Sequence, residues 1–335
     1  MAGEKNLMGT QKCSKGIGQK MTATEIKPIF IVGAERSGTT LFRLMLDHHP
    51  EITVIPEFEY IVDMLPGTEN WPSLDVFHSY LYRDRIFLAQ KFSIDPSLDY
   101  PALGASFLHQ QLIREKKPNV LAVVHRNFDQ LKRIWPSARY IHIVRDPRDV
   151  ARSCIHMGWA GNVWTGVDRW IDAENTWRRL KKQLSPCLYF EVAEELLIAD
   201  PEKILHDISD FIGVDYHRQM LEYAQFTSYS KPDPTLIYQW KQKLTSKEIQ
   251  LVESKAGALL TDAGYQPSGL PLVHPPWVLR LVLRVQDKIS RIRYRLGYMG
   301  IKLFVSDWLS RKFQLMAWQD KLRPRIHEAG RGRLK

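Results

Sequence analysis

Short apolar runs separated by longer amphipathic stretches make up most of the chain. Ile29–Val32 is a run of β-branched and aromatic residues that ends at Gly33, and similar runs recur at Val120–Val124, Tyr140–Val144 and Leu188–Val192. Runs of this length and composition are typical of strands that are buried on both faces of a parallel sheet. The pattern therefore predicts at least four buried strands.

Helical spacing of apolar residues fills the intervals between these runs. We expect helices over Thr39–Asp47, Asp168–Gln183 and Pro201–Ile212, and a further helix capped by Ser246 that runs to about Leu260. Strands that alternate with helices indicate an α/β fold with a parallel β-sheet flanked by helices on both faces. In such folds, ligands bind at the carboxyl ends of the strands.

The chain divides into three predicted parts. Residues 1–26 are rich in Gly, Lys and Gln, and this composition predicts a disordered leader. We expect an α/β domain over residues 27–268 and a basic amphipathic helical tail over residues 269–335. In the tail, one helical stripe is apolar and another face is basic. The apolar stripe comprises Val278, Leu281, Val282, Val285, Ile289 and Ile292, and the basic face comprises Arg280, Arg284, Lys288, Arg291 and Arg295.

Charge is concentrated in that tail. The whole chain carries a formal net charge of +10, whereas residues 270–335 hold 15 Lys and Arg against 4 Asp and Glu. A neutral body with a basic tail indicates an anionic surface or partner, with an anionic membrane surface as one candidate, and no nucleic acid is expected. The alternatives are that the apolar stripe docks onto the body or onto a second copy in a homodimer.

The remaining composition excludes several classes of protein. With 44% hydrophobic and 25% charged residues, the chain is typical of globular proteins. The 3 Cys residues form no Cys-x-x-Cys pair, so no zinc site or redox dithiol is indicated. We find no signal peptide and no transmembrane run, and we expect a cytoplasmic protein that is peripheral at a membrane if the tail binds one.

A glycine-rich turn follows the first predicted strand. Gly33 and Gly38 have the Gly-x₄-Gly spacing of a phosphate loop, whose backbone N–H groups and helix N-terminus surround an anion. Loops that bind nucleoside triphosphates place Lys after the second glycine, where this chain has Thr39. Arg36 supplies a cation within the loop instead. The pattern favours a 5′-phosphate whose transferred group is not a γ-phosphate.

A second group of charged residues follows the run Tyr140–Val144. Arg145 directly follows the strand, Asp146 suits a helix N-cap, and Pro147 suits the first helical position. At the carboxyl edge of the sheet, Arg145 would bind a second phosphate. Capping and surface ion pairing alone would explain the same residues, and a nucleotide hydrolase would use Asp146 as a magnesium ligand.

These two segments carry a family resemblance. Ile31-Val-Gly-Ala-Glu-Arg-Ser-Gly-Thr-Thr-Leu resembles the 5′-phosphosulfate loop of sulfotransferases that use 3′-phosphoadenosine 5′-phosphosulfate (PAPS), and Val144-Arg-Asp-Pro-Arg-Asp-Val-Ala-Arg-Ser resembles their 3′-phosphate motif. Asp47-His-His-Pro followed by Ile55-Pro-Glu is similar to the branch that includes protein-tyrosine sulfotransferases and bacterial relatives. The resemblance implies a P-loop-type α/β fold.

The resemblance also implies roles for individual residues. The loop residues Arg36, Ser37, Gly38, Thr39 and Thr40 would bind the 5′-phosphosulfate of the co-substrate PAPS, and no metal is implied. Arg145 and Ser153 would bind its 3′-phosphate. Partial burial next to Pro56 would raise the pKa of the implied general base, Glu57. The alternatives for that base are Glu59, His48 and His49.

The chain departs from the family pattern at two places. Where the family often has a lysine that contacts the transferred group, this chain has His125 and Arg126, either of which would have to substitute. The usual Tyr-Glu-Asp-Leu is replaced by Glu194-Glu-Leu-Leu, which removes a tyrosine from the expected adenine side.

The function implied is transfer of a sulfuryl group from PAPS to a hydroxyl acceptor by in-line displacement. The acceptor would be a glycan, a lipid, a small molecule or a peptide. Two alternatives remain open. One is a P-loop kinase or nucleotide hydrolase, and the other is a non-catalytic nucleotide-binding protein whose basic tail binds a membrane or a nucleic acid.

Overall fold

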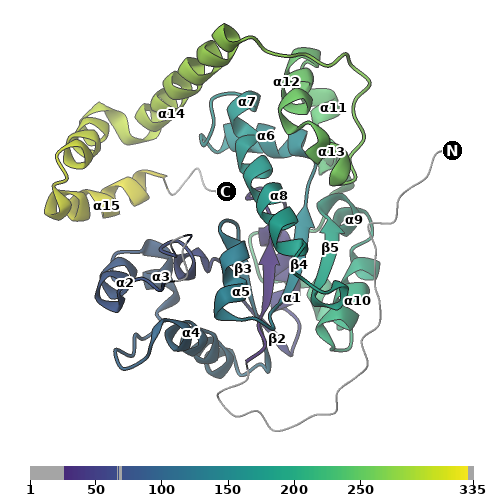
Figure 1. Cartoon of the computed structure of the whole chain (residues 1–335), viewed down its shortest axis with the longest axis vertical. Coiled ribbons are helices and arrows are strands. Elements are labelled where there is room, and N and C mark those ends of the chain that lie inside the picture. Colours follow the sequence, from purple (N-terminus) through teal and green to yellow (C-terminus); the bar gives the residue numbers. More distant parts are fainter. Residues whose placement is uncertain (1–25, 66, 68–69, 331–335) are drawn as a thin grey trace. The chain divides into compact units, whose positions relative to one another are not determined.

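The computed structural model describes residues 26–65, 67 and 70–330. The predicted leader, residues 1–26, lies outside the described residues except for residue 26. The chain forms two compact units (Figure 1). The sheet unit comprises Met1–Arg145, Arg169–Tyr238 and Asp262–Gly264, and the helical unit comprises Asp146–Asp168, Gln239–Thr261 and Tyr265–Lys335. The predicted boundary after residue 268 stays a prediction.

A five-stranded parallel sheet forms the centre of the sheet unit. Its strand order is β2-β3-β1-β4-β5, and every neighbouring pair is parallel. The strands are β1 (Ile29–Val32), β2 (Ile52–Ile55), β3 (Asn119–Val124), β4 (Arg139–Val144) and β5 (Tyr189–Ala193). Four of them match the predicted apolar runs within a residue or two, which confirms the α/β fold. The sequence analysis missed β2. All four of its residues are buried, so the strand shows no alternation of buried and exposed positions.

Helices cover both faces of this sheet. On one face, apolar residues of α1 (Thr39–Asp47) and α10 (Pro201–Ile212) join Ile31, Val123 and Ile143 in one cluster. On the other face, Trp135 packs 5.2 Å from Phe30 and Trp177 stacks on His142 at 4.5 Å, between ring centroids. The remaining helices of this unit are α2 (Leu74–Leu81), α3 (Arg85–Gln90), α4 (Tyr100–Glu115), α5 (Leu131–Ile134), α8 (Asp168–Lys181) and α9 (Glu194–Ala199).

The register of the sheet decides which residues share its carboxyl edge. Val32 of β1 pairs with Val124 of β3 and with His142 of β4. The residues after β1 and β3 are therefore neighbours, and β4 extends two residues further, to Val144. Phosphate-loop residues, His125 and Arg145 consequently belong to one edge of the sheet, as expected for ligand sites of this fold.

The helical unit contains α6 (Pro147–His156), α7 (Val163–Gly166), α11 (Trp240–Lys243), α12 (Ser246–Ala256), α13 (Ala258–Asp262), α14 (Trp277–Lys312) and α15 (Met316–Gly330). The predicted cap at Ser246 is wrong. Thr245 is the N-cap of α12, where its hydroxyl and the Glu248 side chain form a capping box. Gly257 ends that helix, which is why it stops short of the predicted end at Leu260.

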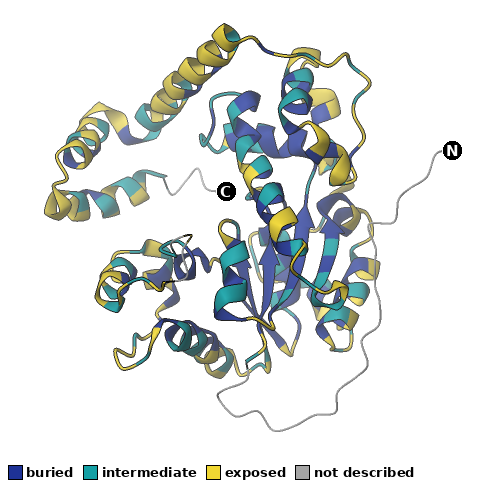
Figure 2. Ribbon diagram, in the orientation of Figure 1, coloured by how far each residue is buried: buried dark blue, intermediate teal, exposed yellow. Residues whose placement is uncertain are grey.

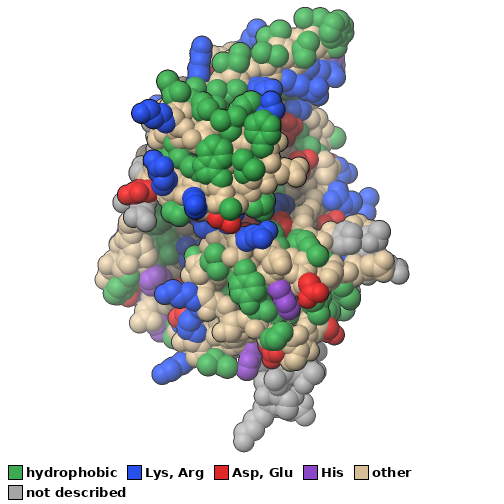
Figure 3. Space-filling view, turned by 90° about the vertical axis from the view of Figure 1, so that its left-hand side faces the viewer, with side chains coloured by type: hydrophobic (Ala, Val, Ile, Leu, Met, Phe, Trp, Pro, Cys, Tyr) green, Lys and Arg blue, Asp and Glu red, His purple; other side chains and the backbone are tan. Residues whose placement is uncertain are grey.

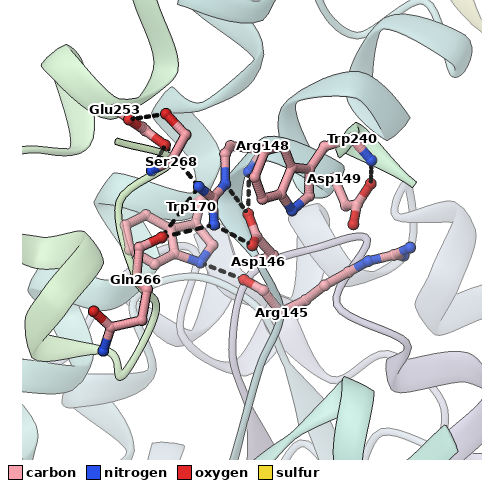
Figure 4. Close-up of polar contacts among 9 residues, drawn as sticks. All are labelled: Arg145, Asp146, Arg148, Asp149, Trp170, Trp240, Glu253, Gln266 and Ser268. Atoms are coloured by element: carbon pink, nitrogen blue, oxygen red, sulfur yellow. Dashed lines mark hydrogen bonds and ion pairs between the residues drawn. The ribbon is translucent and has the colours of Figure 1, made fainter. Parts of the chain in front are cut away.

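A buried arginine ties this unit together (Figure 4). Arg148 is 2% exposed, and its guanidinium contacts the Asp146 and Glu253 carboxylates, each at 2.6 Å. It also donates to the Gln266 carbonyl and lies 3.6 Å from the centre of the Trp240 ring. The N-cap role predicted for Asp146 is confirmed, since its Oδ1 accepts from the Arg148 N–H.

The tail of the chain is mostly helical from Trp277 to Gly330. The long helix α14 is interrupted at Gly300, which has φ of 69° and ψ of 165°, and α15 follows it. Figure 2 shows the strands as largely buried and much of α14 as exposed. Among residues 26–65, 67 and 70–330, none of the helices combines the length and the hydrophobicity needed to cross a membrane.

Candidate functional site

The phosphate loop joins β1 to α1 in a backbone shape that demands glycine at both ends. A Cβ added to Gly33 would lie 2.1 Å from the Ile143 carbonyl oxygen, so β4 leaves no room for a side chain. Gly38 has φ of 76°, and Arg36 adopts a left-handed φ of 73° between them. A left-handed arginine is uncommon, and such strain concentrates at functional sites.

Two polar features of this loop, the Ser37 hydroxyl and the start of α1, bear on what it binds. The Ser37 hydroxyl is fully buried and makes no hydrogen bond within the described residues. Helix α1 begins at Thr39 without a side-chain cap and without an acidic residue in its first turn. An uncapped helix N-terminus carries partial positive charge and free N–H groups, and a buried hydroxyl without a partner is costly. These features fit an oxyanion bound in the loop.

Arg145 extends this positive site from the end of β4. Its Nη1 donates to the Arg36 carbonyl at 3.2 Å, which connects it directly to the loop. Its backbone carbonyl accepts from Trp170 Nε1 at 2.9 Å (Figure 4). The predicted proximity of the loop and Arg145 is thus observed. Ser153, the second residue predicted to bind the 3′-phosphate, lies on α6 in the helical unit and is partly exposed.

A carboxylate that the sequence analysis did not assign lies against the loop. Glu194 Oε2 forms a 2.6 Å ion pair with Arg145 Nε. A Cβ added to Gly38 would lie 2.4 Å from Glu194 Oε1, so this side chain packs directly on the loop glycine. Glu194 is 5% exposed. The sequence marked this position only as the site of a missing tyrosine, because nothing in the local pattern predicts a contact with Gly38.

The two carboxylates after β2 differ in burial. Partial burial was expected for Glu57, but its side chain is exposed, and the expectation is wrong because the neighbouring Glu59 turns inward instead. The Glu57 carboxylate does interact electrostatically with Arg43 of α1. Its backbone carbonyl accepts from Gln90 at 2.6 Å.

Glu59 is 2% exposed and accepts a 3.0 Å hydrogen bond from the His125 backbone N–H through Oε1. Its other oxygen has no hydrogen bond within the described residues. Burial raises the pKa of Glu59, and the nearby His125 opposes that rise only in part. Glu59 therefore anchors the end of β3 and holds its proton more tightly than an exposed carboxyl.

His125 and Arg126, the two candidates for the missing lysine, have different environments. Arg126 forms a bidentate ion pair with Asp63, with both N–O distances 2.7 Å, and this hydrogen bonding raises the pKa of Arg126. His125 Nδ1 lies 3.0 Å from the Gly33 carbonyl oxygen. Because a carbonyl only accepts, Nδ1 carries the hydrogen and Nε2 of a neutral ring keeps its lone pair. His125 is thus attached to the loop.

His48 and His49, the other candidates for a base, are bound to backbone groups. His48 Nδ1 lies 2.7 Å from the Leu44 carbonyl at the C-terminal end of α1. His49 Nε2 lies 2.8 Å from the Asp215 carbonyl, and its Nδ1 accepts from the Glu51 N–H. Since α1 begins at the loop, its C-terminal end lies a full helix length from the phosphate site. These contacts favour a structural role.

No three His, Cys, Asp or Glu side chains come together as metal ligands in the part of the chain that the structure describes. The expectation that no metal takes part stays an expectation. The candidate site comprises the phosphate loop, Arg145 after β4, His125 after β3, two carboxylates after β2, and Glu194 against Gly38.

Comparison with known proteins supports the resemblance found in the sequence. A sequence model of the Sulfotransferase family matches residues 28–218, more than half of the chain. The chain is 27% identical over 215 residues to protein-tyrosine sulfotransferase 2 of Gallus gallus, covering 60% of this chain and 55% of that protein. It is 27% identical over 273 residues to protein-tyrosine sulfotransferase 1 of Danio rerio, covering 72% and 73%.

The chain thus spans about half the length of the first of these relatives. Among solved structures, the sulfotransferase domain of the Synechococcus PCC 7002 olefin synthase matches with a TM-score of 0.50 and 22% identity, over 72% of this chain and 99% of that one. This likeness supports the fold. Together with the family match over residues 28–218, these findings show that the chain belongs to the sulfotransferase family.

Proposed function

We propose that this chain transfers a sulfuryl group from PAPS to a hydroxyl-bearing acceptor. The observation that carries the proposal is the lysine-free phosphate loop. It combines a buried Ser37 hydroxyl, which has no hydrogen bond among the residues that the structure describes, with an α1 N-terminus that lacks a side-chain cap, and Arg145 is hydrogen-bonded to the same loop. Membership of the sulfotransferase family supports the assignment.

Different residues would bind the two phosphate groups of the nucleotide. Arg36 and the groups of Ser37 through Thr40 would bind the 5′-phosphosulfate, where developing negative charge on the leaving phosphate needs N–H groups and cations rather than an acid. Arg145 would bind the 3′-phosphate, and the role of Ser153 toward the same phosphate stays a prediction. Arg145 is suited to that role because a guanidinium binds phosphate through two parallel hydrogen bonds.

Glu57 is the proposed general base. Its exposed carboxylate is accessible to an acceptor, whereas Glu59 is buried and occupied by the His125 N–H. In the transfer, the acceptor oxygen forms a bond to sulfur while the bond from sulfur to the 5′-phosphate oxygen breaks. The hydroxyl proton passes to Glu57, and 3′,5′-bisphosphoadenosine leaves.

His125 is the better candidate for the position that the family often fills with lysine. The Arg126 guanidinium forms an ion pair with the Asp63 carboxylate, whereas the His125 ring is held at the loop by its hydrogen bond to the Gly33 carbonyl. A protonated His125 would supply the positive charge that a lysine supplies, through Nε2–H. Arg126 would then be a structural residue.

A thermal-unfolding screen tests the nucleotide part of this proposal. At about 100 times Kd, 3′,5′-bisphosphoadenosine should stabilise the protein by about 2.7 kcal/mol, and ADP should stabilise it less. Stabilisation by Mg-ATP and not by the bisphosphate would contradict the proposal and favour a kinase or nucleotide hydrolase.

Transfer itself is measured with ³⁵S-labelled PAPS against panels of glycans, lipids, phenols and tyrosine peptides. Label should appear in at least one hydroxyl-bearing acceptor, and the Arg36→Ala variant should lose that transfer. Tight binding of the bisphosphate with no transfer to any panel would favour the alternative of a non-catalytic nucleotide-binding protein.

A further inference from the structure

One face of the long helix α14 packs on the loop between α6 and α7 and on α7 of the same unit. Asp287 Oδ1 accepts from the Gly161 N–H and from the Thr165 hydroxyl, both at 2.7 Å. The Asn162 amide donates to the Leu283 carbonyl at 2.7 Å. A Cβ on Gly161 would lie 2.5 Å from the Asp287 Cα, so the helix lies directly on this loop. The contacts fix which side of α14 faces the unit.

The opposite side of α14 carries the apolar stripe predicted from the sequence, and that stripe is exposed. At 100° per residue, Val285 lies roughly 160° around the helix from Asp287. The exposed fractions are 50% for Val278, 53% for Leu281, 54% for Val282, 50% for Val285, 45% for Ile289 and 37% for Ile292. Within the helical unit the stripe is therefore not the packing face of α14, and the alternative that it docks onto the body stays a prediction.

Cations flank the stripe. Arg284 and Lys288 are exposed and lie between the apolar and docked faces, next to each other at i and i+4. Figure 3 shows hydrophobic and Lys or Arg side chains gathered close together on the surface of the molecule. Residues 270–335 carry 15 Lys and Arg against 4 Asp and Glu. Trp277, at 75% exposure, adds an amphipathic aromatic group at the start of the same helix, and Trp308, at 51%, lies beyond the break at Gly300.

We propose that this face of α14, which we call the tail face, binds the surface of an anionic lipid bilayer. A helix with an exposed aliphatic stripe, flanking Lys and Arg, and tryptophans has the composition of an interfacial helix. The stripe would enter the boundary between headgroups and acyl chains, and the cations would bind the anionic headgroups. The inference does not depend on the proposed enzymatic activity.

Charge argues against the other occupants of this face. A second copy of the chain would bring two rows of cations together along the same stripe, and like charges at close range repel. A nucleic acid would satisfy the cations but would leave the aliphatic side chains without a partner. An anionic bilayer satisfies both groups of side chains.

Vesicle co-sedimentation of the full chain tests the proposal. The protein should sediment with phosphatidylcholine vesicles that contain phosphatidylserine and remain in solution with phosphatidylcholine alone. Leu281→Asp with Val285→Asp should weaken this binding at least tenfold, as should Arg284→Glu with Lys288→Glu. All four positions are exposed, so the variants should fold, and circular dichroism would verify it.

Matched variants away from the tail face serve as controls. Lys182→Glu with Lys247→Glu makes the same change in net charge at two exposed lysines, and Ile113→Asp removes an apolar side chain that is 63% exposed. Both should bind anionic vesicles within about twofold of the unmodified protein. Failure of the unmodified protein to sediment, or equal losses in the control variants, would overturn the proposal. So would a stable dimer in solution that the Leu281 and Val285 variants dissociate.

Discussion

Two arginines of one short motif, Arg145 and Arg148, have opposite environments. Arg148 is 2% exposed and is shared by two carboxylates, a carbonyl and an indole ring. The Arg145 side chain is 17% exposed, pairs with the Glu194 carboxylate, and lies beside a phosphate loop whose Ser37 hydroxyl makes no hydrogen bond within the described residues. A buried charge enclosed by its partners indicates a structural role, whereas a partly exposed cation beside a phosphate loop indicates ligand binding. The comparison predicts that changes at the sheet edge alter binding and rate, and changes around Arg148 alter stability.

The largest expected effect belongs to the sheet edge. Glu57→Gln should lower kcat about 10²–10⁴-fold, because a general base contributes about that much, and should change stability little, because the side chain is exposed. Initial rates with labelled PAPS and denaturant unfolding measure the two quantities. A variant with unchanged kcat would remove Glu57 from the mechanism.

Arg148→Ala should destabilise the protein by about 3–5 kcal/mol, because it leaves the Asp146 and Glu253 carboxylates buried without their cation. Chemical denaturation followed by circular dichroism measures this loss. A milder effect, within about 1 kcal/mol, would mean that Arg148 is not structural and would weaken the comparison.

Arg145→Ala should reduce affinity for 3′,5′-bisphosphoadenosine by about 10–100-fold, the value of a charge-assisted hydrogen bond. Calorimetry should detect this loss, and affinity for 5′-AMP, which lacks the 3′-phosphate, should be affected far less. Equal losses for both nucleotides would show that Arg145 does not select the 3′-phosphate.

Glu194→Gln should tighten binding of the same bisphosphate by about tenfold, because it removes a negative charge beside Gly38 and releases Arg145 from its ion pair. As a matched control, Glu195→Gln changes the adjacent buried carboxylate. Weaker binding in the Glu194 variant would mean that this carboxylate positions Arg145 for the ligand rather than competing with it.

The smallest expected effect is a pH dependence from Glu59. Its raised pKa means that the folded state holds a proton that the unfolded state releases above the ordinary value of 4.5. Stability therefore falls as pH rises from 4.5 through the raised value. Glu59→Gln should flatten this part of the stability profile in denaturant titrations at several pH values. A parallel decline in the variant would assign the dependence to other groups.

The sequence by itself determined the α/β fold, four of the five strands, the phosphate loop and the helix that follows Pro147. These features depend on local patterns, since apolar runs specify buried strands and glycine spacing specifies the loop. Strand β2 escaped because a buried four-residue run such as Ile52–Ile55 has no periodicity of its own.

Only the tertiary structure decided which charged side chains are satisfied. It exposed Glu57 and buried Glu59, paired Arg126 with Asp63, attached His125 to Gly33, and placed Glu194 against Gly38. It also left the apolar stripe of α14 exposed while Asp287 faces the helical unit. The physical reason is that burial and ion pairing depend on contacts between residues distant in the chain, and local sequence does not encode those contacts.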